Sequence, residues 1–310
     1  MSNSRRNPIF SGCFTAITTP FTADGSAIDY GRLEEQIAFQ GAGGVRGIVV
    51  SGTTGESPTL EHEEYESLVE RAVEIGHRHG LLVIAGTGSN STAHAMAMQR
   101  FAAGAGADGG LSVNPYYNQP TQDGLVRHFE AVADASAMPV ILYNIPGRSG
   151  VGLSLETIGR LSRHPRIAAI KDAAGSVDLT AETCAACPGW TVLSGDDPLT
   201  LPMMAVGAVG VVSVASNIVP GRVSAMCAAW LEGRREVALA IHRELLPLMR
   251  ALFVETNPIP VKAAMRLQGR DTGAMRLPMT EATGATVERL RQVVPMDVVV
   301  RTGARVPARG

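Results

Sequence analysis

The sequence predicts an α/β fold in which eight parallel strands close into a (β/α)8, or TIM, barrel with a C-terminal helical extension. Short apolar, β-branched runs that end in polar or glycine-rich turns recur eight times along the 310 residues. A segment with helical periodicity separates each run from the next. Strands that each return through a helix form parallel sheets buried on both faces, and eight such units favour closure into a barrel.

The eight strand-like runs begin with FTAITTP and end with GVVSVASN. They lie at residues 14–20, 47–56, 81–88, 109–117, 139–147, 167–175, 191–197 and 210–217. Helix-like segments lie between them, at residues 30–40, 61–79, 92–104, 122–137, 155–163, 177–186 and 198–206. A doubly wound open sheet is the alternative architecture. It usually carries a phosphate-binding GxGxxG after its first strand, and FTAITTPFTADG contains no such motif.

One catalytic barrel domain is predicted for residues 1–230, followed by a helical extension at residues 231–296. Helical patterns continue after the eighth run, at 221–255, 258–269 and 281–294. No linker rich in Pro, Gly or Ser marks a second independent domain. The polar, glycine-rich residues 297–310 are expected to form a flexible tail.

Charge and hydropathy argue against several classes of partner. The 27 basic and 29 acidic residues nearly balance, which gives no reason to expect a nucleic acid or an anionic membrane. No apolar run approaches the ~20 residues of a membrane span, and MSNSRRNPIF lacks the apolar stretch of a secretory signal. We therefore expect a cytoplasmic protein. The four cysteines are too scattered for a disulfide framework, and the CxxC formed by Cys184 and Cys187 is interpreted as two small apolar residues at a helix end.

Lysine is rare in this chain. Only Lys171 and Lys262 occur, so 27 − 2 = 25 of the basic residues are arginine. Arginine stays protonated, whereas a desolvated lysine can release its proton and act as an amine nucleophile. A lysine in such a chain is therefore a candidate for chemistry that arginine does not perform. Lys262, in NPIPVKAAM, falls on a C-terminal helix and is interpreted as structural.

Polar residues follow the predicted strands, at the end of a barrel where active sites form. They are Thr18–Thr19, Gly52–Thr53–Thr54–Gly55–Glu56, Thr87, Tyr116–Tyr117, Tyr143–Asn144, Lys171–Asp172, Ser194–Gly195–Asp196 and Ser213. No His/Asp/Glu cluster among them suggests a metal site. Lys171 lies in the apolar strand IAAIKDAAG and is a candidate Schiff-base amine; a lysine that extends to solvent from the strand end is the alternative.

Three further positions have side chains suited to the same chemistry. Tyr143 ends the strand before that of Lys171 and could shuttle protons during imine formation, although it could equally line the barrel rim. Thr53 and Thr54 lie between glycines, in a turn suited to binding a small carboxylate. Arg148, expected in a loop five residues after Tyr143, could bind a second carboxylate through its guanidinium, or be solvated surface.

Several motifs together resemble the dihydrodipicolinate synthases, also called 4-hydroxy-tetrahydrodipicolinate synthases, of the pyruvate-dependent class I aldolase superfamily. The motifs are SGTTGESPTL, AGTGSNST, VNPYYNQPTQDGLVRHF, ILYNIPGRSG, AAIKDAAG, LSGDD and FVETNPIPVK. They occur in the family's order and spacing from about residue 10 to about residue 295. The match is therefore more specific than any one motif.

The resemblance implies a role for each matching position. Lys171 would form an imine with pyruvate, so that no added cofactor is needed. Tyr143 would shuttle protons through Thr53 and Tyr117. The latter would reach into a neighbouring subunit's site, which implies a dimer, usually doubled to a homotetramer. Thr54 and the backbone at Val212 would hold the pyruvate carboxylate near Gly195, and Arg148 would bind L-aspartate 4-semialdehyde, in the diaminopimelate and lysine biosynthesis pathway.

Alternatives within the superfamily are N-acetylneuraminate lyases and 2-keto-3-deoxy sugar-acid aldolases. They resemble a GSTGE pattern more than GTTGE and tend to lack the arginine of IPGRSG. Thr53 and Arg148 therefore favour the synthase. A non-catalytic keto-acid-binding regulator is a further alternative, which the intact lysine, tyrosine and threonine set disfavours.

One departure from the family pattern concerns regulation. Lysine-inhibited members resemble a pattern with His and Glu at the positions of Tyr65 and His94, beside Ser57, His62, Asn90 and Tyr116. Here the carboxylate that would pair with the inhibitor's amine is missing. We therefore expect weak or absent inhibition by lysine.

Overall fold

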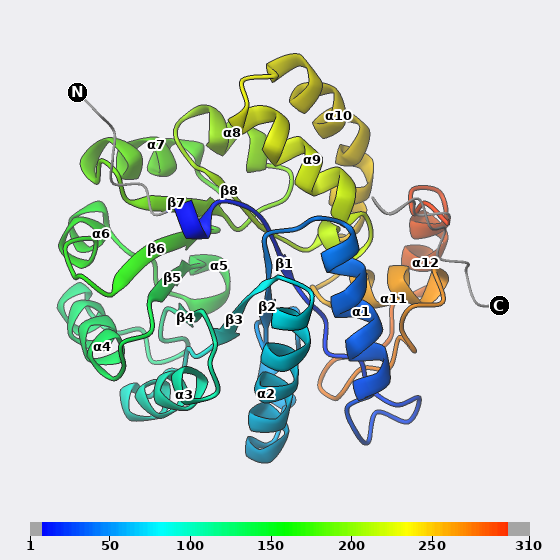
Figure 1. Cartoon of the computed structure of the whole chain (residues 1–310), viewed down its shortest axis with the longest axis horizontal. Coiled ribbons are helices and arrows are strands. Elements are labelled where there is room, and N and C mark those ends of the chain that lie inside the picture. The colour runs from blue at the N-terminus through cyan, green and yellow to red at the C-terminus, as the bar shows by residue number, and fades with distance from the viewer. Residues whose placement is uncertain (1–7, 297–310) are drawn as a thin grey trace. The chain divides into compact units, whose positions relative to one another are not determined.

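The computed structural model describes residues 8–296, and its strands form a closed barrel in the order β1 to β8 (Figure 1). The strands are β1 (Gly12–Ala16), β2 (Gly47–Val50), β3 (Leu82–Gly86), β4 (Gly109–Val113), β5 (Val140–Asn144), β6 (Ile167–Asp172), β7 (Thr191–Ser194) and β8 (Gly210–Ser213). The pairings are parallel wherever the register is defined. The predicted (β/α)8 barrel is therefore confirmed, and the open sheet is excluded.

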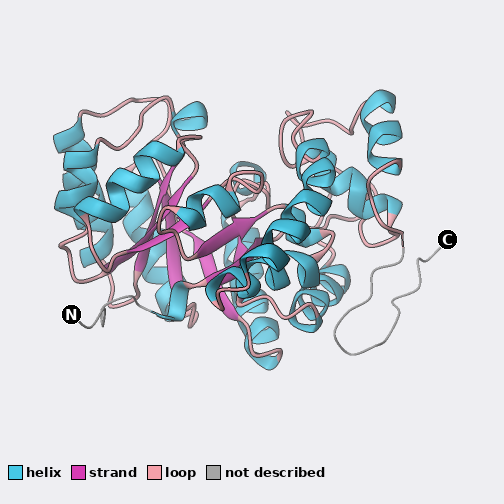
Figure 2. Cartoon of the chain, turned by 90° about the horizontal axis from the view of Figure 1, so that it is seen from above, coloured by secondary structure: helices cyan, strands magenta, loops and turns pink. Residues whose placement is uncertain are grey.

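Helices alternate with these strands along the chain, and Figure 2 distinguishes the helices (cyan) from the strands (magenta). They are α1 (Tyr30–Ala42), α2 (His62–Arg78), α3 (Thr92–Gly104), α4 (Gln122–Asp134), α5 (Pro146–Ser149), α6 (Leu155–Leu161), α7 (Val177–Ala186), α8 (Thr200–Ala205) and α9 (Pro220–Leu231). Three more follow: α10 (Arg235–Ala251), α11 (Ile259–Leu267) and α12 (Gly284–Arg291). Short 3-10 helices lie at Pro8–Phe10, Ser57–Thr59 and Ala215–Asn217.

Local sequence explains where many helices begin. The side chains of Ser91, Thr121, Ser154 and Ser176 each accept a hydrogen bond from a backbone N–H in the first turn of α3, α4, α6 and α7. A side chain in this position satisfies one of the amides that a helix leaves without an internal partner. Loops that follow the strands therefore end at defined residues.

Two helical predictions differ from the structure. The sequence places Arg148 in a loop, but Pro146–Ser149 forms the short helix α5, with Pro146 at its first position. The helical stretch predicted at 221–255 is two helices, α9 and α10, separated at Gly233. That glycine has φ +81°, a left-handed conformation that favours glycine and ends a helix.

The chain divides into two compact units. Among the described residues, one comprises 8–12 and 84–212, and the other comprises 13–83 and 213–296. In the first unit, the N–H of Gly12 donates to the carbonyl of Val209 at 2.9 Å. Any Cβ at Gly210 would lie only 2.0 Å from the Gly12 carbonyl oxygen, so this close backbone approach requires glycine. The predicted boundary at residue 230 stays a prediction, and the predicted tail at 297–310 lies outside the described residues.

Candidate active site

Lys171 and Tyr143 meet at the ends of two adjacent strands of the first unit. The β5–β6 register pairs Tyr143 with Lys171, which places their side chains on the same face of the sheet. The Lys171 Nζ lies 3.9 Å from the centroid of the Tyr143 ring. Each side chain is only 6% exposed. The predicted proximity of these two residues is therefore confirmed.

Gly195, directly after β7, lies against the Lys171 side chain. Its N–H donates to the Asp172 carbonyl at 2.7 Å. A Cβ at position 195 would lie 3.1 Å from the Lys171 Cε and 2.7 Å from the Ala173 Cβ. A larger residue would therefore displace the lysine, and the absence of a side chain leaves space beside the amine. Val211 of β8 pairs with Ser194, the last residue of β7. Val212 and Gly195 are the next residues along the chain, so by this register they occupy neighbouring positions.

The residues that follow Tyr143 and Lys171 belong to a different environment. The sequence places Asn144 and Asp172 at the same mouth, but consecutive strand residues point to opposite faces. Asn144 donates to the Asp172 carboxylate at 3.3 Å, and Thr180 of α7 donates to it at 3.1 Å. These two hydrogen bonds fix the strand ends from the helix side.

Burial sets the charge properties of this second cluster. Burial raises the pKa of the Asp172 carboxyl, while hydrogen bonds from the Ala174 N–H, Thr180 and Asn144 oppose that rise. Asn144 also accepts from Asn114 at 3.1 Å and from the Leu153 N–H at 3.0 Å. No role was predicted for this network. The sequence signal that could have predicted it is the polar pair at the end of each strand, Tyr143–Asn144 in β5 and Lys171–Asp172 in β6.

A backbone hydrogen bond joins Tyr117 to Ser149, the residue that follows Arg148. Arg148 is exposed on α5, and the Tyr117 N–H donates to the carbonyl of Ser149 at 3.4 Å. The Ser149 hydroxyl donates to the Val151 carbonyl at 2.7 Å and so stabilises the end of α5. Tyr117 has φ +74° and is 90% exposed. The Tyr117 side chain is therefore open to solvent within this chain.

Thr53 and Thr54 belong to the second unit, in the turn that follows β2. The Gly55 N–H donates to the Gly52 carbonyl at 3.0 Å, and the Glu56 N–H donates to the Thr53 carbonyl at 3.1 Å. Thr54 is buried, and its hydroxyl oxygen accepts a hydrogen bond from the Asn257 side chain at 3.0 Å. The sequence motif FVETNPIPVK contains Asn257, but no role was predicted for it.

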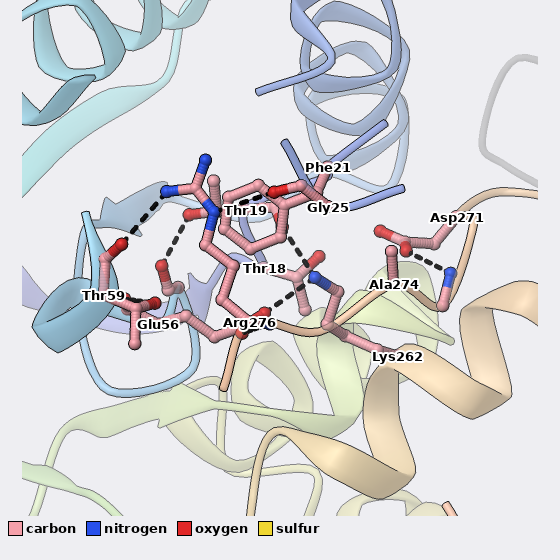
Figure 3. Close-up of polar contacts among 12 residues, drawn as sticks. Thr18, Thr19, Phe21, Gly25, Glu56, Thr59, Lys262, Asp271, Ala274 and Arg276 are labelled. Atoms are coloured by element: carbon pink, nitrogen blue, oxygen red, sulfur yellow. Dashed lines mark hydrogen bonds and ion pairs between the residues drawn. The ribbon is translucent and has the colours of Figure 1, made fainter. Parts of the chain in front are cut away.

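Lys262 lies on α11, as predicted, and is completely buried. Its Nζ donates to Glu56 Oε1 at 2.7 Å and to the Thr19 carbonyl at 2.9 Å (Figure 3). These contacts are consistent with the structural interpretation of this lysine. The pairing with Glu56 was not predicted, because the two residues lie 206 positions apart.

Within residues 8–296, no helix has both the length and the apolar character needed to cross a membrane. Across the same residues, none of the four cysteines is part of a disulfide. Cys184 lies on α7 and Cys187 follows its last residue, which agrees with the interpretation of the CxxC as the end of a helix.

Comparison with known proteins places these features in one family. Residues 9–296 match the model of the dihydrodipicolinate synthetase family. The 4-hydroxy-tetrahydrodipicolinate synthase of Geotalea daltonii is 47% identical over 287 residues, which cover 92% of this chain and 98% of that protein. That of Geobacter sulfurreducens is also 47% identical over 287 residues, with the same coverage.

Solved structures agree with this assignment. The 4-hydroxy-tetrahydrodipicolinate synthase structure from Methylacidiphilum fumariolicum has a TM-score of 0.89 and 45% identity, covering 92% of this chain and 94% of that chain. The dihydrodipicolinate synthase structure from Aquifex aeolicus has the same TM-score and identity, covering 92% and 97%. The chain is a lyase and belongs to the dihydrodipicolinate synthetase family.

Proposed function

We propose that this protein is a 4-hydroxy-tetrahydrodipicolinate synthase that condenses pyruvate with L-aspartate 4-semialdehyde through an imine on Lys171. The observation that carries the proposal is the position of the Lys171 amine, 3.9 Å from the Tyr143 ring and beside the side-chain-free Gly195. Among the described residues, Lys171 forms no ion pair, so no carboxylate competes for its nitrogen. Membership of the family supplies the reaction class.

The reaction follows from the chemistry of a lysine imine. The Lys171 amine attacks the keto carbon of pyruvate, and water leaves as the imine forms. The protonated imine accepts electrons, so a methyl proton departs and an enamine results. The enamine carbon attacks the aldehyde carbon of the second substrate. The amino group of that adduct then displaces Lys171 by transimination, which closes the ring and frees the enzyme without any added cofactor.

Proton transfer is assigned to Tyr143, with Thr53 and Tyr117 as its relay. Imine formation requires a proton to be delivered to the leaving hydroxyl. Enamine formation then requires a proton to be removed from the methyl group, and one phenol near both atoms can do both. The contact between Tyr143 and Lys171 supports this role. Tyr117, at 90% exposure, is proposed to complete the relay in a neighbouring subunit.

Binding of the two carboxylates is assigned to two sets of groups. The Thr54 hydroxyl and the backbone at Val212 are proposed to hold the pyruvate carboxylate, with Gly195 leaving space for the keto acid. Arg148 is proposed to bind the carboxylate of the aldehyde substrate through its guanidinium. The exposure of Arg148 on α5 supports access to a ligand.

The assembly is proposed to be a dimer that doubles to a homotetramer. Its support is the exposed Tyr117, which a neighbouring subunit would cover. A monomeric dihydrodipicolinate synthase variant, 40% identical to this chain, is among the similar structures, so the family fold does not by itself fix the assembly. Mass measurement of the native protein, with Tyr117→Ala as a comparison, tests this assignment.

Borohydride trapping tests the proposed mechanism directly. The protein is incubated with pyruvate, reduced, digested and mapped by mass spectrometry. We expect the pyruvate-derived adduct on the peptide that contains Lys171. Label on Lys262, or no label at all, would show that the proposal is wrong.

A substrate comparison then tests the choice within the superfamily. Turnover is measured with pyruvate plus aspartate semialdehyde, and cleavage is measured with N-acetylneuraminate and with 2-keto-3-deoxygluconate. The proposal expects turnover of the first pair to exceed both cleavage reactions. Arg148→Leu should raise the half-saturation concentration of the semialdehyde more than that of pyruvate, because the arginine contacts only the second substrate.

A further inference from the structure

The Lys262–Glu56 contact joins helix α11 to the turn that carries Thr53 and Thr54. Lys262 is 0% exposed and Glu56 is 3% exposed. Their charged atoms lie 2.7 Å apart, and the Lys262 Nζ also lies 4.4 Å from the centroid of the Phe21 ring (Figure 3). A buried ion pair of this kind is often no more stabilising than an apolar pair of the same volume. Stability alone is therefore a weak explanation for it.

Glu56 is the residue through which this contact reaches the turn. Its backbone has φ +54°, a left-handed conformation that is uncommon for residues other than glycine. Its N–H donates to the Thr53 carbonyl, and its two carboxylate oxygens bond to Lys262 Nζ and to the Arg276 N–H, the latter at 3.2 Å. The backbone N–H and the carboxylate of Glu56 are thus both hydrogen-bonded. A shift of the carboxylate would therefore pull on the N–H and move the Thr53 carbonyl that it contacts.

Arg276 fixes the other side of the same turn. Its guanidinium donates to the Thr59 carbonyl at 3.0 Å and bonds both oxygens of the Glu64 carboxylate, at 2.5 and 2.6 Å. Glu64 in turn accepts from the Glu61 N–H at the start of α2. The Glu56 carboxylate therefore lies between two anchored segments, α11 on one side and the Arg276 backbone on the other.

Asn257 reaches the turn from the same C-terminal segment, five residues before Lys262. Its side-chain N–H donates to the Thr54 Oγ1 at 3.0 Å. A threonine hydroxyl has one proton to donate, and an oxygen that accepts from an amide keeps that proton available for another acceptor. The contact therefore leaves the Thr54 proton free to be directed at a carboxylate.

We propose that residues 257–262 position the Thr53–Thr54 turn for the keto acid, with Lys262 acting through the Glu56 carboxylate and Asn257 acting through the Thr54 hydroxyl. Both are positioning residues, because neither needs to touch substrate. The inference rests on the proposed function, in which Thr54 holds the pyruvate carboxylate. It assigns to the helical segment after the barrel an indirect part in substrate binding, through Glu56 and Thr54.

The first test compares Lys262→Met, Glu56→Gln and the double variant. Each single change leaves one buried charge unpaired and is expected to lower the unfolding temperature, whereas the double change removes both charges and restores it. A role in positioning predicts that the double variant still shows a half-saturation concentration for pyruvate raised about tenfold, the size of one hydrogen bond to a charged group. A double variant that recovers both stability and wild-type pyruvate saturation would overturn the inference for Lys262.

The second test is a mutant cycle that does not depend on the ion pair. Thr54→Val, Asn257→Leu and the double variant are compared by steady-state kinetics at varied pyruvate. If Asn257 acts through the Thr54 hydroxyl, Asn257→Leu raises the pyruvate KM about tenfold in the wild-type background and has no further effect beside Thr54→Val. Additive effects of the two changes would contradict the inference.

Borohydride trapping keeps these outcomes separate from a failure of the proposed function. Label on Lys171 in the wild type establishes the imine whether or not residues 257–262 position the turn. If that label is present and the half-saturation concentration of pyruvate is unchanged in the Lys262, Glu56 and Asn257 variants, only the positioning role is contradicted and the proposed function stands. Circular dichroism and thermal unfolding are recorded for each variant, so that a folding defect is distinguished from a binding defect.

Discussion

The two lysines of this chain occupy opposite kinds of environment. Lys262 is enclosed completely on α11, with a carboxylate 2.7 Å from its nitrogen. Lys171 lies at the end of β6 beside an aromatic ring and a glycine, and forms no ion pair with any residue in the range 8–296. Under the proposed mechanism, burial alone does not make a lysine reactive. A buried carboxylate partner engages the amine, and a site without one leaves the amine available to a carbonyl carbon.

The largest expected effect comes from replacing the amine of Lys171. Lys171→Arg introduces a side chain of similar length whose guanidinium stays protonated and cannot form an imine. We expect kcat/KM to fall by at least ~10³-fold, because removing a covalent nucleophile costs this much or more. Undiminished turnover would end the assignment.

The second prediction concerns the stability that Lys262 provides. Lys262→Met leaves the Glu56 carboxylate buried without its cation, which costs about 3–5 kcal/mol of unfolding free energy. Urea unfolding at neutral pH measures the loss, and the Lys262→Met/Glu56→Gln variant is the matched control. If Lys262→Met lowered the unfolding free energy by less than about 1 kcal/mol, Lys262 would not be engaged by its carboxylate partner as the comparison with Lys171 requires.

The third prediction concerns Asp172, the carboxylate next to Lys171 in sequence. Burial raises its pKa in the folded protein above the ordinary value of 3.8. The folded state therefore binds this proton more tightly than the unfolded state, so the associated stability is present at low pH and is lost as pH rises from 3.8 through the raised pKa.

The variant Asp172→Asn isolates this contribution. Unfolding free energies are measured between pH 4 and pH 7, and the wild-type values are compared with those of the variant. The wild type should lose stability relative to Asp172→Asn over the lower part of that range. If the unfolding free energy of the wild type instead rose relative to that of Asp172→Asn with increasing pH, Asp172 would have a cationic partner, as Glu56 has. The surroundings of Lys171 and Lys262 would then not differ in this respect.

The smallest expected effect is that of free lysine as an inhibitor. The amine of a lysine inhibitor needs a carboxylate partner, as the Lys262 amine does in Glu56. Lysine-inhibited members resemble a pattern with His and Glu at the positions of Tyr65 and His94. Neither Tyr65 nor His94 supplies a carboxylate. Tyr65 is buried, and His94 lies 3.4 Å from the Ser89 hydroxyl. We expect steady-state rates to change little at millimolar lysine, and inhibition at micromolar lysine would refute this. Tyr65→His/His94→Glu, which restores the pattern, is the positive control.

Much of the fold could be predicted because its signals are local. Each strand is a short apolar run, and helices α3 and α7 begin directly after the capping residues Ser91 and Ser176. The α5 helix was missed because four residues are too few to show a period. The break between α9 and α10 was missed because the residues that flank Gly233, in the stretch WLEGRREVA, are mostly good helix formers.

The sequence by itself determined the alternation of strands and helices, the rarity of lysine, and the placement of Tyr143 and Lys171 at the ends of successive strands. Parallel pairing of neighbouring strands brings such ends together, so the pair follows from order alone. Only the tertiary structure decided that Lys262 meets Glu56 and that Asn257 meets Thr54. These contacts join residues more than 200 positions apart, and chain folding, not local propensity, sets which distant polar groups satisfy one another once water is excluded.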